Sequence, residues 1–174
     1  MKRRDFLNRT VAASLVLPAY VSFMPPISVR PPHLKLSLNA YSFNRALREG
    51  SMSLDDLLDF CAALPFDAVD PTAYYFPGYP QVPEDAFLYD FKRKAFERGL
   101  AISGTGVRND YTLTDTAARK SDLRLVENWV TAAAKMGAPS LRVFAGKKVN
   151  DRAEWKKAWP HLIDGLKASA DFGA

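Results

Sequence analysis

The stretch FDAVDPTAYYFPGYP, at residues 66–80, places polar and aromatic side chains directly after an apolar segment. Phe66–Val69 has the character of a buried strand, and Pro71 ends it. The side chains that follow on the loop are Asp70, Thr72, Tyr74 and Tyr75. A carboxylate at the carboxyl end of a strand, with aromatic residues just beyond it, is typical of the rim of a small-molecule site in α/β proteins.

Three other apolar segments end in polar loops of the same kind. Residues 34–41 alternate apolar and polar side chains as a strand does, and Asn39, Tyr41, Ser42 and Asn44 gather at the end of this segment. A strand beginning at Leu100 leads into GTGVRND at 104–110, and a strand beginning at Ser140 contains Arg142. The planar donor forks of Arg108 and Arg142 suit a phosphate or a carboxylate group.

Helices are predicted between these strands and after the last one. Ser53 and Asp56 suit a capping box at the start of a first helix, which stops near Pro65. A second helix starts around Pro83, carries a buried stripe of Leu88, Phe91, Ala95 and Phe96, and ends at Gly99. A third ends at Gly137, and a fourth starts after Asp151 and should be kinked or split by Pro160.

The alternation of strands and helices sets the fold class. It predicts an α/β chain of parallel (β/α) repeats joined by right-handed crossovers. A parallel sheet is normally covered or closed, so four such units form an incomplete sheet. Its open edge offers a route for self-association.

The N-terminal residues 1–30 are predicted to be an export signal and linker, and residues 31–174 to be the folded domain. Arg3 and Arg4 precede a Phe-Leu pair, and an apolar run from Val11 to Met24 follows. This run is shorter than the roughly 20 residues that a membrane span needs. The arginine pair resembles a twin-arginine signal, which predicts an exported, periplasmic protein with no permanent membrane span after signal removal. The alternatives are an amphipathic N-terminal helix and an uncleaved anchor.

Charge and cysteine content exclude other classes of function. Residues 1–30 carry five basic side chains and one acidic one, a net of +4, and subtracting this from the formal +5 leaves +1 for the remainder. A nearly neutral domain does not favour nucleic-acid binding through bulk charge. Cys61 is the only cysteine, so no intramolecular disulfide forms, and its place on an apolar helix face predicts a buried structural residue. The chain also lacks a dinucleotide fingerprint, a P-loop and cysteine metal spacing.

With these segments placed, the chain resembles the sugar phosphate isomerase/epimerase family, the xylose isomerase-like TIM barrels. The likeness is carried by SLNAYSFN at 37–44, FDAVDPTAYYFPGYP at 66–80, GTGVRND at 104–110 and GAPSLRVFAG at 137–146. It implies that the chain equals the first four units of a TIM barrel, about its N-terminal half. Pro71 and Ala73 depart from the family pattern, which predicts a lost ladder donor at Pro71 and strain at Ala73 if its backbone is left-handed.

The resemblance implies a sugar or sugar phosphate as the substrate, and metal-assisted proton transfer between neighbouring carbons as the reaction. The complete family fold uses a divalent metal (Mn²⁺, Mg²⁺ or Zn²⁺), whose ligands come mainly from later strands, so none is assigned within this chain. The residues implied to line the substrate side are Asn39, Tyr41, Asp70, Thr72, Tyr74, Thr105, Arg108, Asn109 and Arg142.

Several alternatives remain open at this stage. Arg108 suits a solvated loop position, and Arg142 suits an ion pair with Asp70 inside the barrel. The catalytic residues are unknown. For the chain as a whole, the alternatives to an enzyme are a non-catalytic sugar-binding module and an inactive truncated product.

Overall fold

The computed structural model describes residues 34–147 and 149–174. The chain divides into two units, Met1–Leu34 and Lys35–Ala174, and the second contains the strands and helices described below. The predicted export signal at residues 1–30 lies outside the described residues. Within the described part, no helix is long and apolar enough to cross a membrane.

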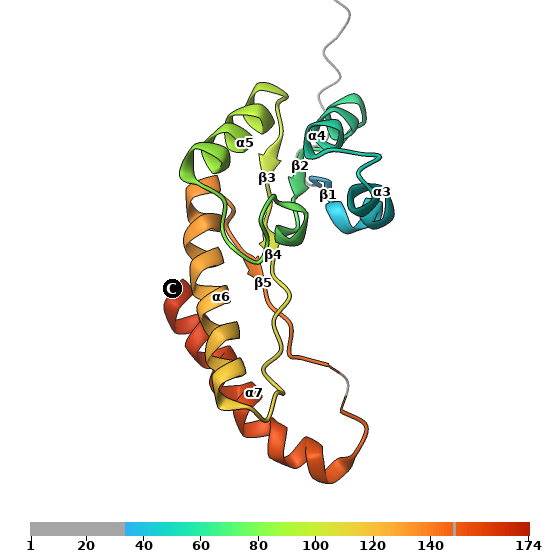
Figure 1. Ribbon diagram of the computed structural model, residues 1–174. Helices are drawn as coiled ribbons and strands as arrows, with labels where there is room; N and C mark the ends of the chain where they lie inside the picture. The colour runs from blue at the N-terminus through green and yellow to red at the C-terminus, as the bar shows by residue number, and fades with distance from the viewer. Residues whose placement is uncertain (1–33, 148) are drawn as a thin grey trace, which may run out of the picture. The chain divides into compact units, whose positions relative to one another are not determined.

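Two short parallel sheets carry the strands. The first contains β1 (Ser37–Asn39), β2 (Ala68–Asp70) and β3 (Ala101–Ile102), with Asn39 opposite Asp70. The second contains β4 (Thr105–Gly106) and β5 (Leu141–Arg142), with Gly106 opposite Arg142. The described strands do not close into a barrel (Figure 1). The predicted class, an α/β chain of parallel repeats forming an incomplete barrel, is confirmed.

The third predicted strand is divided between these two sheets. The amide of Ser103 donates to the carbonyl of Val69 at 3.0 Å, whereas the amide of Thr105 donates to the carbonyl of Ser140 at 3.0 Å. The chain therefore changes its bonding partner at Gly104. A Cβ atom there would lie 2.8 Å from the Ser140 hydroxyl oxygen, so the absence of a side chain lets the two segments approach.

In the described part of the chain, five helices and two 3₁₀ turns lie between the strands and after the last one. They are η1 (Ala40–Phe43), α3 (Asn44–Glu49), α4 (Leu54–Ala63), η2 (Ala73–Tyr75), α5 (Asp85–Glu97), α6 (Thr116–Met136) and α7 (Arg152–Gly173). The Ser53–Asp56 capping box is present at the start of α4. Helix α6 ends at Gly137, which adopts φ 78°, as a C-terminal glycine commonly does. Helix α7 is continuous across Pro160, so of the two predicted outcomes, a kink or a split, the split is wrong and the kink stays a prediction.

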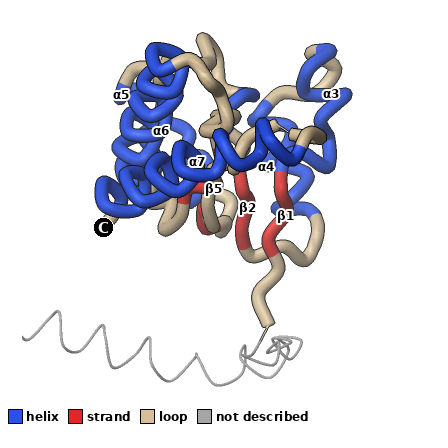
Figure 2. The backbone as a smooth tube through the Cα atoms, turned by 90° about the horizontal axis from the view of Figure 1, so that it is seen from below, coloured by secondary structure: helices blue, strands red, loops and turns tan. Residues whose placement is uncertain are grey.

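The core lies between the strands and the helices that cover them. Helices α5, α6 and α7 pack side by side, outside the strands (Figures 1 and 2). Phe76 is buried in edge-to-face contacts with Phe87, Phe91 and Trp129. Cys61 is fully buried, as predicted. Phe96, by contrast, is 81% exposed, because it points away from the face of α5 that Leu88, Phe91 and Ala95 bury.

Neither family departure strains the backbone. Strand β2 ends at Asp70, so Pro71 follows the ladder and removes no donor from the paired residues. Ala73 begins η2, and no described residue other than glycine has a positive φ. The strain considered for Ala73 is therefore not found.

Candidate functional site

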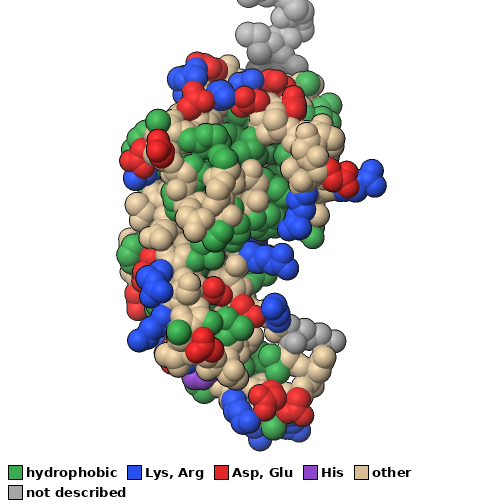
Figure 3. All heavy atoms as spheres, in the orientation of Figure 1, with side chains coloured by type: hydrophobic (Ala, Val, Ile, Leu, Met, Phe, Trp, Pro, Cys, Tyr) green, Lys and Arg blue, Asp and Glu red, His purple; other side chains and the backbone are tan. Residues whose placement is uncertain are grey.

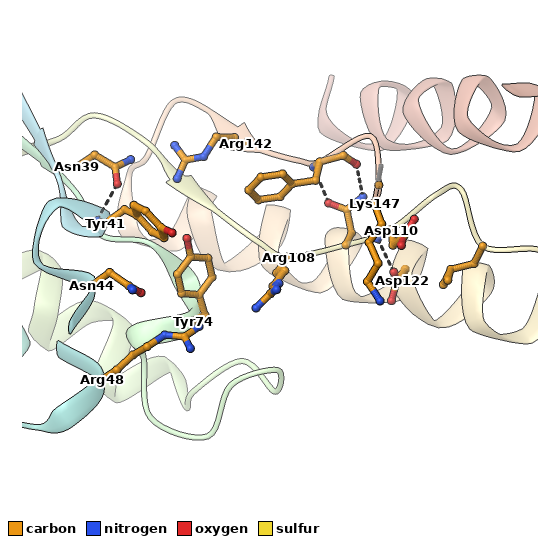
Figure 4. Close-up of a pocket in the computed structure, with 14 residues that line it drawn as sticks. Asn39, Tyr41, Asn44, Arg48, Tyr74, Arg108, Asp110, Asp122, Arg142 and Lys147 are labelled. Atoms are coloured by element: carbon orange, nitrogen blue, oxygen red, sulfur yellow. Dashed lines mark hydrogen bonds between the residues drawn. The ribbon is translucent and has the colours of Figure 1, made fainter. Parts of the chain in front are cut away.

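A cavity of about 1040 Å³ lies at the carboxyl ends of the strands. Its lining residues are Asn39, Tyr41, Asn44, Arg48, Tyr74, Arg108, Asn109, Asp110, Leu113, Asp122, Arg142, Phe144, Gly146 and Lys147. Asn39 and Arg142 are the last residues of β1 and β5, and the others come from the loops and helices that follow four successive strand segments. The labelled side chains lie around one opening (Figure 4). Basic side chains border a hollow on the face that Figure 3 shows. The size suits a sugar-sized ligand.

Of the nine residues named from the sequence, six line this cavity: Asn39, Tyr41, Tyr74, Arg108, Asn109 and Arg142. Asp70, Thr72 and Thr105 are not among the lining residues. Asp70 and Thr72 bond to residues that line the cavity, and Thr105 bonds to the loop after β2. The structure thus brings the loops together, and it separates residues that face the opening from residues that hold others in place. Contact with a substrate stays a prediction for all nine.

Asp70 holds two of the lining residues at once. Its Oδ2 atom accepts hydrogen bonds from Asn39 Nδ2 at 2.9 Å and from Arg142 Nη1 at 2.8 Å. The alternative in which Arg142 pairs with Asp70 is therefore the one that the structure shows. The Asp70 Oδ1 atom is buried and has no hydrogen-bond partner among the described residues. The carboxylate thus fixes one end of the Arg142 fork, whose other donors remain toward the cavity.

The absence of a side chain at Gly106 makes this pairing possible. A Cβ atom there would lie 2.7 Å from Arg142 Nη2 and 3.0 Å from its Cζ. Because Gly106 and Arg142 are opposite each other in the β4–β5 pair, the guanidinium lies across the glycine on its way to Asp70.

Thr72 and Thr105 are buried and bond to protein groups. Thr105 Oγ1 donates to the carbonyl of Pro71 at 2.6 Å, and Thr72 Oγ1 donates to Asn39 Oδ1 at 3.4 Å. Both hydroxyls are thereby satisfied inside the fold. They join the loop after β2 to its neighbours on either side, so their role is to position Asn39 and this loop.

Asn109 clamps the two halves of the second sheet together. Its Nδ2 donates to the carbonyl of Phe144 at 2.7 Å, and its Oδ1 accepts from the amide of Phe144 at 2.7 Å. The side chain is nearly buried. This two-point contact with one main-chain residue fixes the loops after β4 and β5 relative to each other.

The loop after β2 presents three tyrosines with distinct roles. Tyr74 faces the cavity (Figure 4). Its ring contacts those of Tyr75 and Tyr79. Burial raises the pKa of Tyr74, and the positive charge of Arg142 partly offsets this. Burial, together with the neighbouring Tyr74, raises the pKa of Tyr75 to about 12. All three hydroxyls therefore stay protonated at neutral pH, since burial raises the pKa of Tyr79 as well.

Sequence reasoning missed several lining residues. Arg48 lies on α3, a helix that the sequence did not predict, and Asp122 lies within the first turns of α6. Asp122 Oδ2 accepts a hydrogen bond from the amide of Asp110 at 2.6 Å, which joins α6 to the loop after β4. One signal was available, because Arg48 is one helical turn beyond Asn44, a residue of the first polar cluster.

The cavity residues do not form a metal centre. Among the described residues that line it, Asp110 and Asp122 carry carboxylates, and Asp110 Oδ1 accepts from the amide and hydroxyl of Thr112. No group of three or more His, Cys, Asp or Glu residues in the described part is placed to hold a metal ion. A divalent metal therefore stays a prediction for the complete fold and has no assigned ligands here.

Comparison with protein-family models shows which family the chain belongs to. The family model described as "xylose isomerase-like TIM barrel" matches residues 58–174. The chain belongs to this family. A search of curated proteins found no match.

Solved structures of the xylose isomerase-like fold are also similar to the chain. A sugar phosphate isomerase/epimerase from Parabacteroides distasonis aligns with a TM-score of 0.59 at 14% identity, over 84% of this chain and 51% of that one. The D-psicose 3-epimerase of Clostridium cellulolyticum aligns with a TM-score of 0.57 at 14% identity, over 81% and 50%. The probable 3-DHS dehydratase AsbF of Bacillus anthracis aligns with a TM-score of 0.58 at 17% identity, over 80% and 49%. At these identities the likeness shows the fold, and the chain spans about half the length of these solved structures.

Proposed function

We propose that this chain binds a sugar in the cavity at the carboxyl ends of its strands, as the substrate-binding part of an isomerase or epimerase of the xylose isomerase-like family. The observation that carries the proposal is the convergence of polar and aromatic side chains from four successive strand segments on one cavity. Active sites of TIM barrels lie at this end of the strands. Similar solved structures include proteins named as sugar epimerases, which supports a sugar as the ligand.

The residues of this chain suit binding and orientation. Tyr41 and Tyr74 supply aromatic faces against which the C–H face of a sugar ring packs. The guanidinium donors of Arg142 that do not bond to Asp70 suit hydrogen bonds to sugar hydroxyl or carbonyl oxygens. Asp70 and Asn109 keep these groups in place through the contacts described above.

The proton-transfer chemistry of the proposed enzyme is not assigned to residues of this chain. In a complete fold of this family, a divalent metal such as Mn²⁺, Mg²⁺ or Zn²⁺ would polarise the sugar carbonyl. The described residues offer no group of ligands for such an ion. The role assigned here is therefore to bind the sugar and hold its orientation.

A sugar-binding module without catalysis is the second candidate. It is favoured by hydrogen-bonding side chains that are already fixed by their neighbours, as binding and orientation require. Export to the periplasm by a twin-arginine signal is also proposed, from the sequence of residues 1–30 alone.

Isothermal titration of D-tagatose and D-fructose, with and without Mn²⁺, tests the proposal on the full chain. Saturable binding of either sugar supports it, and a Tyr74→Ala variant should bind at least about fivefold more weakly because an aromatic contact is worth about 1 kcal/mol. Metal-independent binding without turnover selects the binding module, whereas Mn²⁺-dependent conversion of the sugar selects the enzyme. A cooperatively folded chain that binds neither sugar contradicts the proposal. Exposed Tyr89, on α5 and outside the cavity, provides the control variant Tyr89→Ala.

A further inference from the structure

We propose that Arg48 and Arg108 together form an anion-binding position at the rim of the cavity, which takes the phosphate or carboxylate group of an anionic sugar. The inference rests on the proposed sugar-binding function and deepens it, because it specifies a negatively charged substrate and the residues that bind its charged group. It also differs from the expectation for Arg142, whose guanidinium is already paired with Asp70.

The first argument is that these two guanidinium groups have no partner among the residues that the structure describes. Arg45, Arg93 and Arg98 form ion pairs with acidic side chains, and Arg119 donates to two main-chain carbonyls. For the side chains of Arg48 and Arg108, no hydrogen bond or ion pair to another described residue is present. Both line the same cavity, so two sets of planar donors face its space. Such donors match the oxygens of phosphate and carboxylate groups.

The second argument is that one loop bonds to both of the segments that carry these arginines. Tyr75 donates its hydroxyl hydrogen to Asn44 Oδ1 at 2.8 Å, at the first residue of the helix that carries Arg48. Tyr79 accepts a hydrogen bond from the main-chain amide of Arg108 at 2.9 Å. The aromatic loop after β2 therefore holds both arginine-bearing segments. Their side chains lie on either side of Tyr74 (Figure 4), so one ligand group beside this ring is within the region that both segments border.

The third argument is electrostatic. Burial raises the pKa of both Tyr74 and Tyr75, and the positive charge of Arg48, which lies beside Tyr74 (Figure 4), offsets a small part of this rise. Arg108 acts in the same direction on Tyr79. Asp110 and Asp122 also line the cavity, but neither forms an ion pair with Arg48 or Arg108 within the described residues. The positive charge at this part of the rim is therefore left for a ligand.

The test is isothermal titration of the full chain with two matched pairs of sugars, D-fructose with D-fructose 6-phosphate and D-glucose with D-glucuronate. Inorganic phosphate is titrated alone as a third arm. The variants are Arg48→Gln and Arg108→Gln, which remove one charge each at exposed positions, and Arg48→Lys, which keeps the charge without the fork. The control is Arg124→Gln, which removes an exposed charge from α6 outside the cavity.

We expect one anionic sugar to bind the wild type about tenfold more tightly than its neutral partner, the scale of one charge-assisted hydrogen bond at an exposed site. Arg48→Gln and Arg108→Gln should each remove most of this gain, so that the affinities for the anionic and the neutral sugar become similar. Arg48→Lys should restore part of it, and Arg124→Gln should keep all of it. A gain seen with D-fructose 6-phosphate identifies a phosphate ester as the ligand group, and a gain seen with D-glucuronate identifies a sugar acid.

Two results overturn the inference. One is equal affinity of the wild type for the anionic and neutral member of both pairs, and the other is equal loss in Arg48→Gln and Arg124→Gln. Either result leaves the proposed function standing if the neutral sugar binds. Conversely, binding of inorganic phosphate that Arg48→Gln and Arg108→Gln weaken, without binding of any neutral sugar, supports the anion position and counts against the proposed sugar site.

Discussion

Arg142 Nη1 lies 2.8 Å from Asp70 Oδ2, and this ion pair connects β5 to β2 across the segment that carries β4. The residues are 72 positions apart in sequence. The side chain of Asp70 is 17% exposed and that of Arg142 is 40% exposed, so the carboxylate is largely withdrawn from water. Since Asp70 also accepts from Asn39, one carboxylate links three of the four strand ends that surround the cavity.

We predict that Asp70→Asn lowers the free energy of unfolding by about 1–2 kcal/mol, because it removes a charge-assisted contact from a partly buried pair. Urea denaturation at neutral pH measures the loss. The control is Asp59→Asn, which breaks the ion pair between Arg98 and a carboxylate that is 64% exposed and should cost less. Equal losses in the two variants would show that the Asp70 pair contributes no more than a surface contact.

Gly106 provides a second test of the same geometry. An alanine Cβ at this position would lie 2.7 Å from Arg142 Nη2, so the guanidinium must move and its contact with Asp70 must weaken. We expect Gly106→Ala to cost about 1 kcal/mol and to be non-additive with Asp70→Asn in a double-mutant cycle. Additive losses would indicate that Arg142 moves aside without releasing Asp70.

Much of the fold follows from local sequence patterns, because they depend on contacts within a few residues. The capping residues Ser53 and Asp151 and the terminal glycine Gly137 mark helix ends where the structure has them. The division of the third strand at Gly104 was not predictable in this way. The division arises because the residue before Gly104 bonds to β2 and the residue after it bonds to the segment before β5. Such pairing between distant segments cannot be read from the local sequence. Phe96 fits the apolar spacing of α5 but lies beyond the width of its buried face.

Some residues of the candidate site could likewise be predicted from the sequence, and others could not. Polar residues directly after strands, such as Tyr41 and Arg108, could be named from sequence because strand ends share one edge of a parallel sheet. Arg48 and Asp122 could not, since their side chains reach the cavity from helices. The distinction between lining and supporting residues also required coordinates, because Thr72 and Tyr74 are close in sequence but only Tyr74 faces the opening.

Gly165 should be intolerant of substitution because α7 packs on Tyr111 at this point. A Cβ atom would lie 2.5 Å from Tyr111 Cγ, and the Tyr111 hydroxyl is hydrogen-bonded to Ser169 one helical turn further along. Glycine to alanine inside a helix normally stabilises by about 1 kcal/mol. We predict the opposite sign here, a loss of about 1–3 kcal/mol from overpacking, measured by urea denaturation.

Gly173 on the same helix supplies the matched control, since nothing lies within 4 Å of a Cβ atom placed there. Gly173→Ala should be neutral or slightly stabilising. Combining Gly165→Ala with Tyr111→Leu should recover part of the loss, because the smaller side chain opens space. Similar stability for Gly165→Ala and Gly173→Ala would show that α7 adjusts its position at little cost.

The raised pKa of Tyr75 predicts a loss of stability at alkaline pH. Tyrosine in the unfolded chain titrates near its ordinary value of 10, whereas Tyr75 in the folded chain titrates at about 12, mainly because of burial. Between these values the folded state binds the proton more tightly, so this contribution is complete below pH 10 and is lost as pH rises toward 12. Tyr75→Phe lacks the titrating group and also the hydrogen bond to Asn44.

Urea denaturation should therefore show Tyr75→Phe to be less stable than the wild type below pH 10, with a difference in the free energy of unfolding that shrinks as the pH is raised above 10. The exposed Tyr89 offers the control Tyr89→Phe, which should follow the wild-type pH dependence, and a difference for Tyr75→Phe that stays constant across this range would contradict the burial of the Tyr75 hydroxyl.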